Sequence, residues 1–141
     1  PLADELDLAR RYLRIEELRL GERLSLHWQV DALPGDALVP PLTLQPLLEN
    51  AVYHGIEPRM DGGVIAVNGR HDDSVLHITI ENPAAPTGAI RRGAGMALDN
   101  VRARLDYAFG DRARLRLERG QEGYRLELDL PYERDDEDSD R

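Results

Sequence analysis

The sequence predicts a two-layer α/β sandwich, an α+β domain in which a mixed, mostly antiparallel sheet is covered by helices on one face. Three segments have apolar residues at helical spacing, and five shorter segments alternate apolar and polar residues as strands do. Four of these strand segments form two pairs joined by short polar or glycine-containing turns, which are typical of antiparallel hairpins. The two hairpins exclude the all-parallel sheet of a Rossmann-type fold.

The composition is that of one globular domain. A chain of 141 residues with 41% hydrophobic and 32% charged residues can bury a sizeable core. Its net charge of −9 argues against direct nucleic-acid binding, which needs a basic surface. The absence of cysteine excludes disulfides and thiolate metal sites, and no apolar run is long enough to cross a bilayer. We therefore expect a cytoplasmic domain.

The first predicted elements are a helix at residues 2–20, which ends at Gly21, and a strand at residues 24–30 with His27 on its wetter face. Thr43 is the expected N-cap of the next helix. The apolar arc of the first helix is broader than burial on one side requires. Either this helix packs partly on its own core and partly on a partner helix, or it is an ordinary amphipathic helix. The arc contains Leu6, Leu8, Tyr12, Leu13, Ile15, Leu18 and Leu20.

The central helix, predicted for residues 44–56, presents polar residues opposite a buried face. Glu49, Asn50 and Tyr53 fall on the side away from the apolar stripe, and His54 lies at its edge. A helix with a core on one side and an acid–amide pair on the other is suited to present chemistry to a cavity. The alternative is that Glu49 and Asn50 are ordinary solvated residues. The apolar stripe consists of Leu44, Leu47, Leu48, Ala51 and Val52.

The second half of the chain is predicted to contain two hairpins on either side of a third helix. The first hairpin joins strands at residues 63–70 and 74–81, the helix covers residues 96–109, and the second hairpin joins residues 113–118 and 124–130. The acidic run at residues 133–141 has no apolar side chain and is expected to be a disordered tail.

Residues 82–95 form a long loop with two prolines and three glycines. Loops of this length in compact domains are usually lids or binding loops, and the alternative is a plain surface connection. The segment GAGMAL at residues 93–98, where the loop meets the following helix, resembles a phosphate-binding turn. Its glycines let the backbone approach an anion, and the N–H groups that open the following helix face it. The alternative for this turn is a flexible joint.

The order of these features resembles the Bergerat ATP-binding fold, which is shared by gyrase B, the Hsp90 chaperones, histidine kinases and MutL. Within that fold, the sequence is most similar to the catalytic domain of LytS/YehU/AlgZ-type sensor histidine kinases. The similarity spans nearly the whole chain, from YLRIEELRLGERL through PPLTLQPLLENAVYHGI to GAGMALDNVRARL. The resemblance implies a domain that binds Mg-ATP and delivers its γ-phosphoryl group to a histidine.

The resemblance also implies a role for each residue that matches a family motif. Asn50 would supply an oxygen ligand to Mg²⁺, and Glu49 would be the general base beside the γ-phosphate. His54 would line the phosphate or ribose side of the pocket, and residues 93–98 would be the hinge of a lid over the phosphates. The implied ATP-binding residues are Asn50, Tyr53, His54, Asn82, Gly93, Gly95, Met96, Ala97 and Leu98, and Asn50 is also the implied metal ligand.

Three positions depart from the family's pattern. Tyr53 stands where a lysine is common, and Ala97 replaces the third glycine of the phosphate-binding motif. Asn82 takes the place of the aspartate that usually recognises the adenine amino group. An asparagine can still accept a hydrogen bond from adenine, but without charge assistance. We therefore expect weak ATP binding, with a Kd of roughly tens to hundreds of micromolar.

The resemblance further implies a division of the chain. Residues 1–21 would be the end of a dimerisation and phosphotransfer segment. Residues 22–132 would be the ATP-binding domain, with its lid at residues 82–95, followed by the acidic tail. The four histidines lie in the wrong elements to be the phosphoacceptor, so that histidine would lie on upstream helices outside this chain. These histidines are His27, His54, His71 and His77.

The implied partners are the upstream helices of the same kinase and a response regulator of the LytTR DNA-binding class. The parent protein would be a homodimer anchored in the inner membrane. Two alternatives stay open. The departures at Tyr53, Asn82 and Ala97 would suit a nucleotide-gated pseudokinase or interaction module with little or no phosphotransfer. The other alternative is a structural α/β domain without a ligand.

Overall fold

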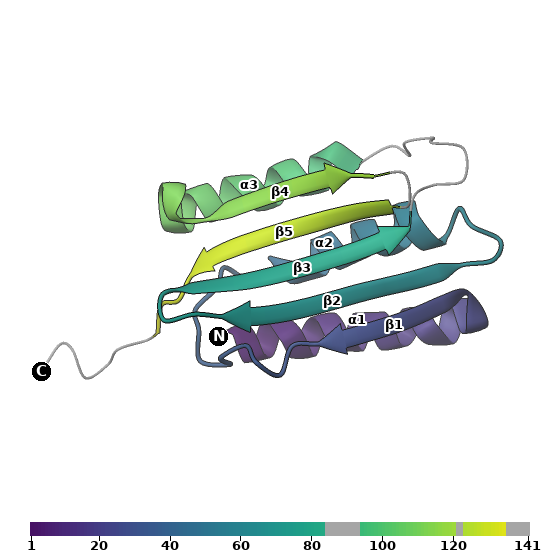
Figure 1. Ribbon diagram of the computed structural model, residues 1–141, viewed down its shortest axis with the longest axis horizontal. Helices are drawn as coiled ribbons and strands as arrows, with labels where there is room; N and C mark the ends of the chain where they lie inside the picture. The colour runs from purple at the N-terminus through teal and green to yellow at the C-terminus, as the bar shows by residue number, and fades with distance from the viewer. Residues whose placement is uncertain (84–93, 121–122, 135–141) are drawn as a thin grey trace, which may run out of the picture.

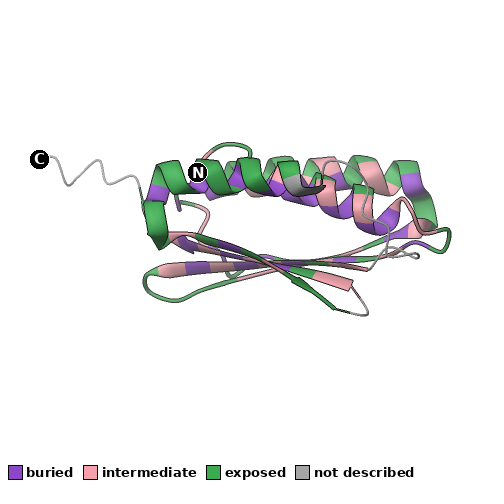
Figure 2. Cartoon of the chain, turned by 90° about the horizontal axis from the view of Figure 1, so that it is seen from above, coloured by how far each residue is buried: buried purple, intermediate pink, exposed green. Residues whose placement is uncertain are grey.

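The computed structural model describes residues 1–83, 94–120 and 123–134. These residues contain a five-stranded sheet and three α-helices, and the helices lie behind the sheet on one of its faces (Figure 1). Seen from above, the helices form one layer and the sheet forms the other, while the outer face of the sheet is open (Figure 2). The predicted two-layer α/β sandwich is confirmed.

The elements follow the predicted order along the chain. The helices are α1 (Leu2–Leu20), α2 (Leu44–Ala51) and α3 (Ala94–Phe109). Each is followed by a short helical turn: η1 (Gly21–Arg23), η2 (Val52–Ile56) and η3 (Gly110–Arg112). The strands are β1 (Leu24–Gln29), β2 (Gly63–His71), β3 (Val75–Pro83), β4 (Arg114–Arg119) and β5 (Gly123–Pro131).

Both ends of the loop expected at residues 82–95 belong to regular elements. β3 continues through Asn82 to Pro83 because both residues pair with β5. α3 already begins at Ala94, so Gly95 is helical. We expected Asn82 and Gly95 in a loop, and the structure places them in a strand and a helix. Gly93, the other residues between β3 and α3, and the acidic tail from residue 135 lie outside the described residues.

The sheet has the strand order β1-β2-β3-β5-β4. β1 runs parallel to β2, and the other neighbouring pairs are antiparallel. β2 and β3 form the first predicted hairpin, and β4 and β5 form the second. β5 is the strand that joins the two hairpins, because it pairs with β3 on one side and with β4 on the other. This pairing brings the end of β3 beside the start of β5.

The core lies between the helix layer and the inner face of the sheet. Alternate residues of the two central strands point into it, as strand periodicity requires. These residues are Leu76, Ile78 and Ile80 of β3 and Leu126, Leu128 and Leu130 of β5. The apolar stripe predicted for the central helix is buried in the same core, and it consists of Leu44, Leu47, Leu48, Ala51 and Val52.

Helix α1 carries apolar residues on two faces. Leu8, Ile15 and Leu18 keep 43%, 62% and 83% of their surfaces exposed. The broad arc predicted from the sequence is therefore divided between a face in the core and a face outside it. A partner helix on the outer face stays a prediction. The buried face consists of Leu2, Ala9, Leu13 and Leu20.

The N-terminus of α2 is capped from another helix. The carboxylate of Glu5, a residue only 7% exposed, accepts hydrogen bonds from the backbone N–H groups of Leu42, Thr43 and Leu44 at 2.7, 3.1 and 3.2 Å. Thr43 is the N-cap residue by position, as predicted, but its side chain does not cap the helix, because its hydroxyl donates to the Pro40 carbonyl at 2.7 Å. A carboxylate from α1 thus satisfies the first N–H groups and complements the positive end of the helix dipole.

Helix α3 holds the same turn from a second side. Leu42 has a φ of 58°, a left-handed backbone conformation that is uncommon for a residue with a Cβ. Nη1 of Arg104 donates hydrogen bonds to the carbonyls of Pro41 and Leu42 at 3.2 and 3.0 Å. With Glu5 on the N–H side and Arg104 on the carbonyl side, the surrounding structure maintains this conformation of Leu42.

We expect Glu5→Gln to lower the free energy of unfolding by about 1–3 kcal/mol, because the amide presents N–H donors to backbone N–H groups that need an acceptor. Urea unfolding followed by circular dichroism measures the loss. Asp4→Asn is the matched control, since Asp4 is exposed on the same helix and the change is expected to stay within about 0.5 kcal/mol. Equal losses in the two variants would contradict the capping role of Glu5.

Candidate functional site

The central helix ends in a single π-helical turn, η2. The N–H of Glu57 bonds to the carbonyl of Val52, five residues earlier, at 3.0 Å. Such turns are rare and are frequent at functional sites, because they redirect the side chains around them. Tyr53 and His54 lie in this turn, directly after the part of α2 that carries Asn50. The helix predicted for residues 44–56 is therefore confirmed over its whole length. Hydrophobic periodicity did not indicate that its geometry changes from α-helical to π-helical at Val52.

Glu49 and Asn50 lie on different flanks of α2, because successive helical residues are about 100° apart. The exposed carboxylate of Glu49 accepts a hydrogen bond from Nε2 of Gln45 at 2.9 Å. Burial, followed by the nearby carboxylates of Glu16 and Glu49, raises the pKa of the Tyr12 phenol on α1. Glu49 therefore lies on the flank of α2 that faces α1.

Asn50 and His54 are both half-buried and lie one helical turn apart, so they share the other flank of the central helix. The exposed ring of Tyr53 contacts the ring of His54 edge to face, with 4.8 Å between the ring centroids and 86° between the planes. The three residues predicted to line a nucleotide pocket around the end of α2 are thus close together.

The structure brings Asn82 to the end of the same helix. Asn82 continues the inward alternation of Ile78 and Ile80 along β3, so it lies on the helix-covered face of the sheet. Its side chain packs on the backbone of Gly55 in η2, where an added Cβ would lie 2.5 Å from Nδ2. Nδ2 also donates to the Pro83 carbonyl at 3.0 Å. The residue predicted to recognise adenine is therefore adjacent to the turn that carries Tyr53 and His54.

The segment predicted to bind phosphates is described from Ala94 onward and is helical there. It opens α3, which packs beside α2 in the helix layer (Figure 1). Met96 is exposed and Ala97 is half-buried. Leu98 is 7% exposed, and its side chain belongs to the core.

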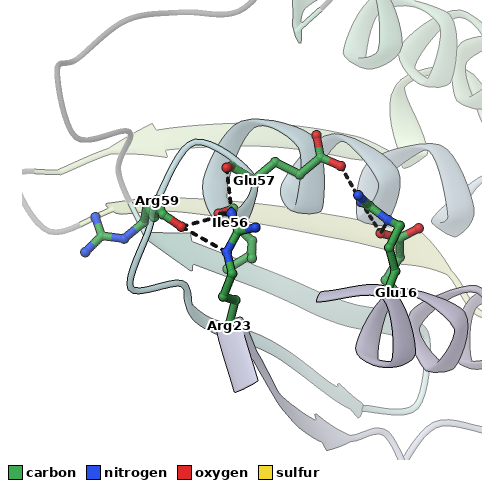
Figure 3. A network of polar contacts seen from close by, with 6 residues as sticks. Glu16, Arg23, Ile56, Glu57 and Arg59 are labelled. Atoms are coloured by element: carbon green, nitrogen blue, oxygen red, sulfur yellow. Dashed lines mark hydrogen bonds and ion pairs between the residues drawn. The ribbon is translucent and has the colours of Figure 1, made fainter. Parts of the chain in front are cut away.

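A network that sequence reasoning missed holds the C-terminal end of η2. Nη2 of Arg23 donates to the carbonyls of Glu57 and Arg59 at 2.7 and 3.0 Å (Figure 3). The carboxylate of Glu57 pairs with Arg19 on α1, which also pairs with Glu16. Arginine donors at a helix end satisfy its last carbonyl groups and interact favourably with the dipole. These residues are distant in the sequence, so no local pattern indicates the network.

The outer face of the sheet carries polar and charged side chains that pair with one another. Nδ1 of His77 lies 2.7 Å from Oδ1 of Asp129, and Nη2 of Arg116 lies 2.7 Å from Oε2 of Glu127. These side chains line a hollow of about 410 Å³. The charges of Arg116 and Glu127 are already paired with each other. Within the part of the chain that the structure describes, no three His, Cys, Asp or Glu side chains are grouped to hold a metal ion.

The donor set around Asn50 fits a magnesium ion that is bound mainly through a nucleotide. On this flank of α2 Asn50 offers one amide oxygen, whereas the carboxylate of Glu49 lies on the other flank, toward α1. Mg²⁺ commonly takes one or two protein oxygens and completes its octahedron with phosphate oxygens and water. So small a donor set suits a metal that arrives with its nucleotide better than a permanently held ion.

Proteins similar to this chain are sensor histidine kinases. Sensor histidine kinase BtsS from Escherichia coli K12 is 32% identical over 132 residues, which are 93% of this chain and 24% of BtsS. Sensor histidine kinase YesM from Bacillus subtilis is 33% identical over 135 residues, which cover 92% of this chain and 23% of YesM. The chain is a relative of the sensor histidine kinases. It spans about a quarter of the length of these curated relatives.

The type of kinase predicted from the sequence is also among the relatives. Sensor protein LytS from Oceanobacillus iheyensis is 28% identical over 146 residues, which cover 94% of this chain and 25% of LytS. The resemblance to LytS-type sensor kinases is confirmed. No protein-family model matches the chain.

Solved structures of histidine kinases have the same fold. The catalytic domain of histidine kinase ThkA superposes with a TM-score of 0.63 at 17% identity and covers 93% of this chain and 90% of its own. The blue-light-activated histidine kinase EL346 from Erythrobacter litoralis superposes with a TM-score of 0.64 at 21% identity, over 94% of this chain and 42% of EL346. At these identities the comparison shows the fold, which is the one that the resemblance predicted. Of the helices in the described ranges, none is long and apolar enough to cross a membrane.

We expect Arg23→Ala to raise amide hydrogen exchange in η2 and the residues after it by roughly tenfold, because several carbonyls at this end lose their donor. Hydrogen exchange read by mass spectrometry on peptides covering residues 52–62 measures the effect. Arg14→Ala is the control, since Arg14 is an exposed arginine on α1. Unchanged exchange in these peptides, or an equal rise in the control, would show that Arg23 does not stabilise the turn.

Proposed function

We propose that this chain is the ATP-binding catalytic domain of a two-component sensor histidine kinase. The observation that carries the proposal is the contact between Asn82 and Gly55. This contact brings the end of β3, where Asn82 would recognise adenine, against the helical element on which Asn50 would hold Mg²⁺. The sensor kinase relatives and the fold of histidine kinase catalytic domains support the same function.

Each residue has a defined task in this proposal. Asn82 accepts a hydrogen bond from the adenine amino group through Oδ1, while Tyr53 and His54 flank the sugar and phosphates. The amide oxygen of Asn50 ligates Mg²⁺, which when bound neutralises charge on the phosphates. Glu49 lies on the flank that faces α1, and its carboxylate orients the attacking nucleophile and takes up its proton.

The phosphoryl acceptor in this proposal is a histidine on dimerisation helices outside this chain, and ADP is the other product. The exposed face of α1, with Leu8, Ile15 and Leu18, supports packing against such helices. The phosphoryl group then passes to an aspartate of a response regulator, of the LytTR DNA-binding class. The parent protein is a homodimer anchored in the inner membrane, with this domain on the cytoplasmic side.

A second candidate function is a nucleotide-gated pseudokinase or interaction module. The observation that favours it concerns Asn82. Nδ2 of Asn82 donates to the Pro83 carbonyl, so only the neutral Oδ1 is left to accept a hydrogen bond from adenine, where the family has a charged aspartate. Phosphotransfer from radiolabelled ATP, assayed with the histidine-bearing helices supplied, separates the two functions. Labelled histidine supports the kinase, and ATP binding without label supports the pseudokinase.

We expect Asn50→Ala to abolish the Mg²⁺ dependence of ATP binding, because the variant lacks the amide oxygen that ligates the metal. Calorimetric titration with ATP, with and without Mg²⁺, measures the effect against a native Kd of roughly tens to hundreds of micromolar. Asn68→Ala on the outer sheet face is the matched control, and thermal melting should show that both variants stay folded. If Asn50→Ala unfolds the domain, Asn50 is structural and the site is wrongly assigned.

A further inference from the structure

The last two residues of β3 lie among three glycines that come from three different elements. A Cβ added to Gly55 of η2 would meet Nδ2, Cβ and Cγ of Asn82 at 2.5, 2.9 and 3.0 Å. A Cβ added to Gly63 of β2 would lie 2.6 Å from Cγ of Pro83. A Cβ on Gly123 of β5 would collide with the carbonyl oxygen of Asn82. We call these three residues the glycine cradle.

The reason for glycine in this cradle is space rather than backbone conformation. Among the described glycines, positive φ values occur at Gly21, Gly62 and Gly110, and none of these belongs to the cradle. A residue with a Cβ could therefore adopt the backbone conformations of the cradle positions. It would collide with Asn82 or Pro83 instead, since real Cβ atoms essentially never approach other heavy atoms within 3.0 Å.

Of the three cradle residues, Gly55 is the one that lies against the Asn82 amide. Nδ2 lies against Gly55 and donates to the Pro83 carbonyl at 3.0 Å. Because the amide group is planar and its nitrogen is held, Oδ1 has one defined position and acts as an acceptor. A fixed acceptor favours a purine with an amino group at C6, as in adenine. It disfavours a purine with a carbonyl at C6, because two acceptors then face each other.

We propose that Gly55 is a positioning residue for Asn82: because Gly55 has no Cβ, Asn82 can hold its amide in the orientation that presents Oδ1 to the amino group of adenine. The inference rests on the proposed ATP-binding function. Gly55 lies five residues after Asn50 on the same helical element. The contact with Asn82 therefore also sets the distance between the amide that selects the base and the amide that holds the metal.

The test compares the affinities of Mg-ATP and Mg-ITP, which differ only at C6 of the base. Calorimetric titration gives the Kd ratio for the native chain, Gly55→Ala and the control Gly120→Ala, whose added Cβ would make only an ordinary 3.5 Å contact. We expect the native chain and the control to prefer ATP by about tenfold. Gly55→Ala should lose most of this ratio through weaker ATP binding, with ITP binding little changed.

A second variant keeps the test decisive if Gly55→Ala does not fold. Gly55→Ala combined with Asn82→Gly removes all three Asn82 atoms that the new Cβ would meet, so we expect it to fold and to bind ATP and ITP equally. A double variant that also fails to fold would overturn the inference. A native chain that binds Mg-ATP and Mg-ITP equally would also overturn the inference, and so would a Gly55→Ala variant with the native Kd ratio. Neither result would contradict the proposed binding of ATP. A native chain that binds neither nucleotide at millimolar concentration would overturn the proposed function itself.

Discussion

Charged side chains from the N-terminal segment hold both ends of the central helix, and the candidate site depends on them. Glu5 accepts hydrogen bonds from the N–H groups that open α2, and Arg23 donates to the carbonyls that close η2. The first and last backbone groups of any helix lack partners within it. Here those partners come from α1 and the turn after it, so α1 determines where the helix with Asn50 lies.

This arrangement gives α1 two roles that fall on different faces. One face is buried and, through Glu5, bonded to the start of the central helix, while Leu8, Ile15 and Leu18 are exposed on another. A displacement of α1 would therefore also displace Asn50 and the π-helical turn behind it. Within the described residues, Arg116, Glu127 and Arg125 on the outer face of the sheet pair among themselves.

The sequence by itself determined the order of elements, the extent of α1, the buried stripe of α2 and both hairpins. These features depend on hydrophobic periodicity and turn residues, which act over a few positions and can be read along the chain. Motif strings also indicated the sensor kinase family and the candidate site residues. The roles of Glu49, Asn50 and the other site residues stay predictions, because they concern a ligand that periodicity does not specify.

Only the tertiary structure decided how the elements meet. It placed β5 between β3 and β4, made Glu5 rather than Thr43 the side-chain cap of α2, and extended β3 through Asn82 to a contact with Gly55. Each of these features joins residues that are distant in the sequence. Their energies come from hydrogen bonds and close packing between elements, and such contacts leave no periodic signal in either of the segments that they connect.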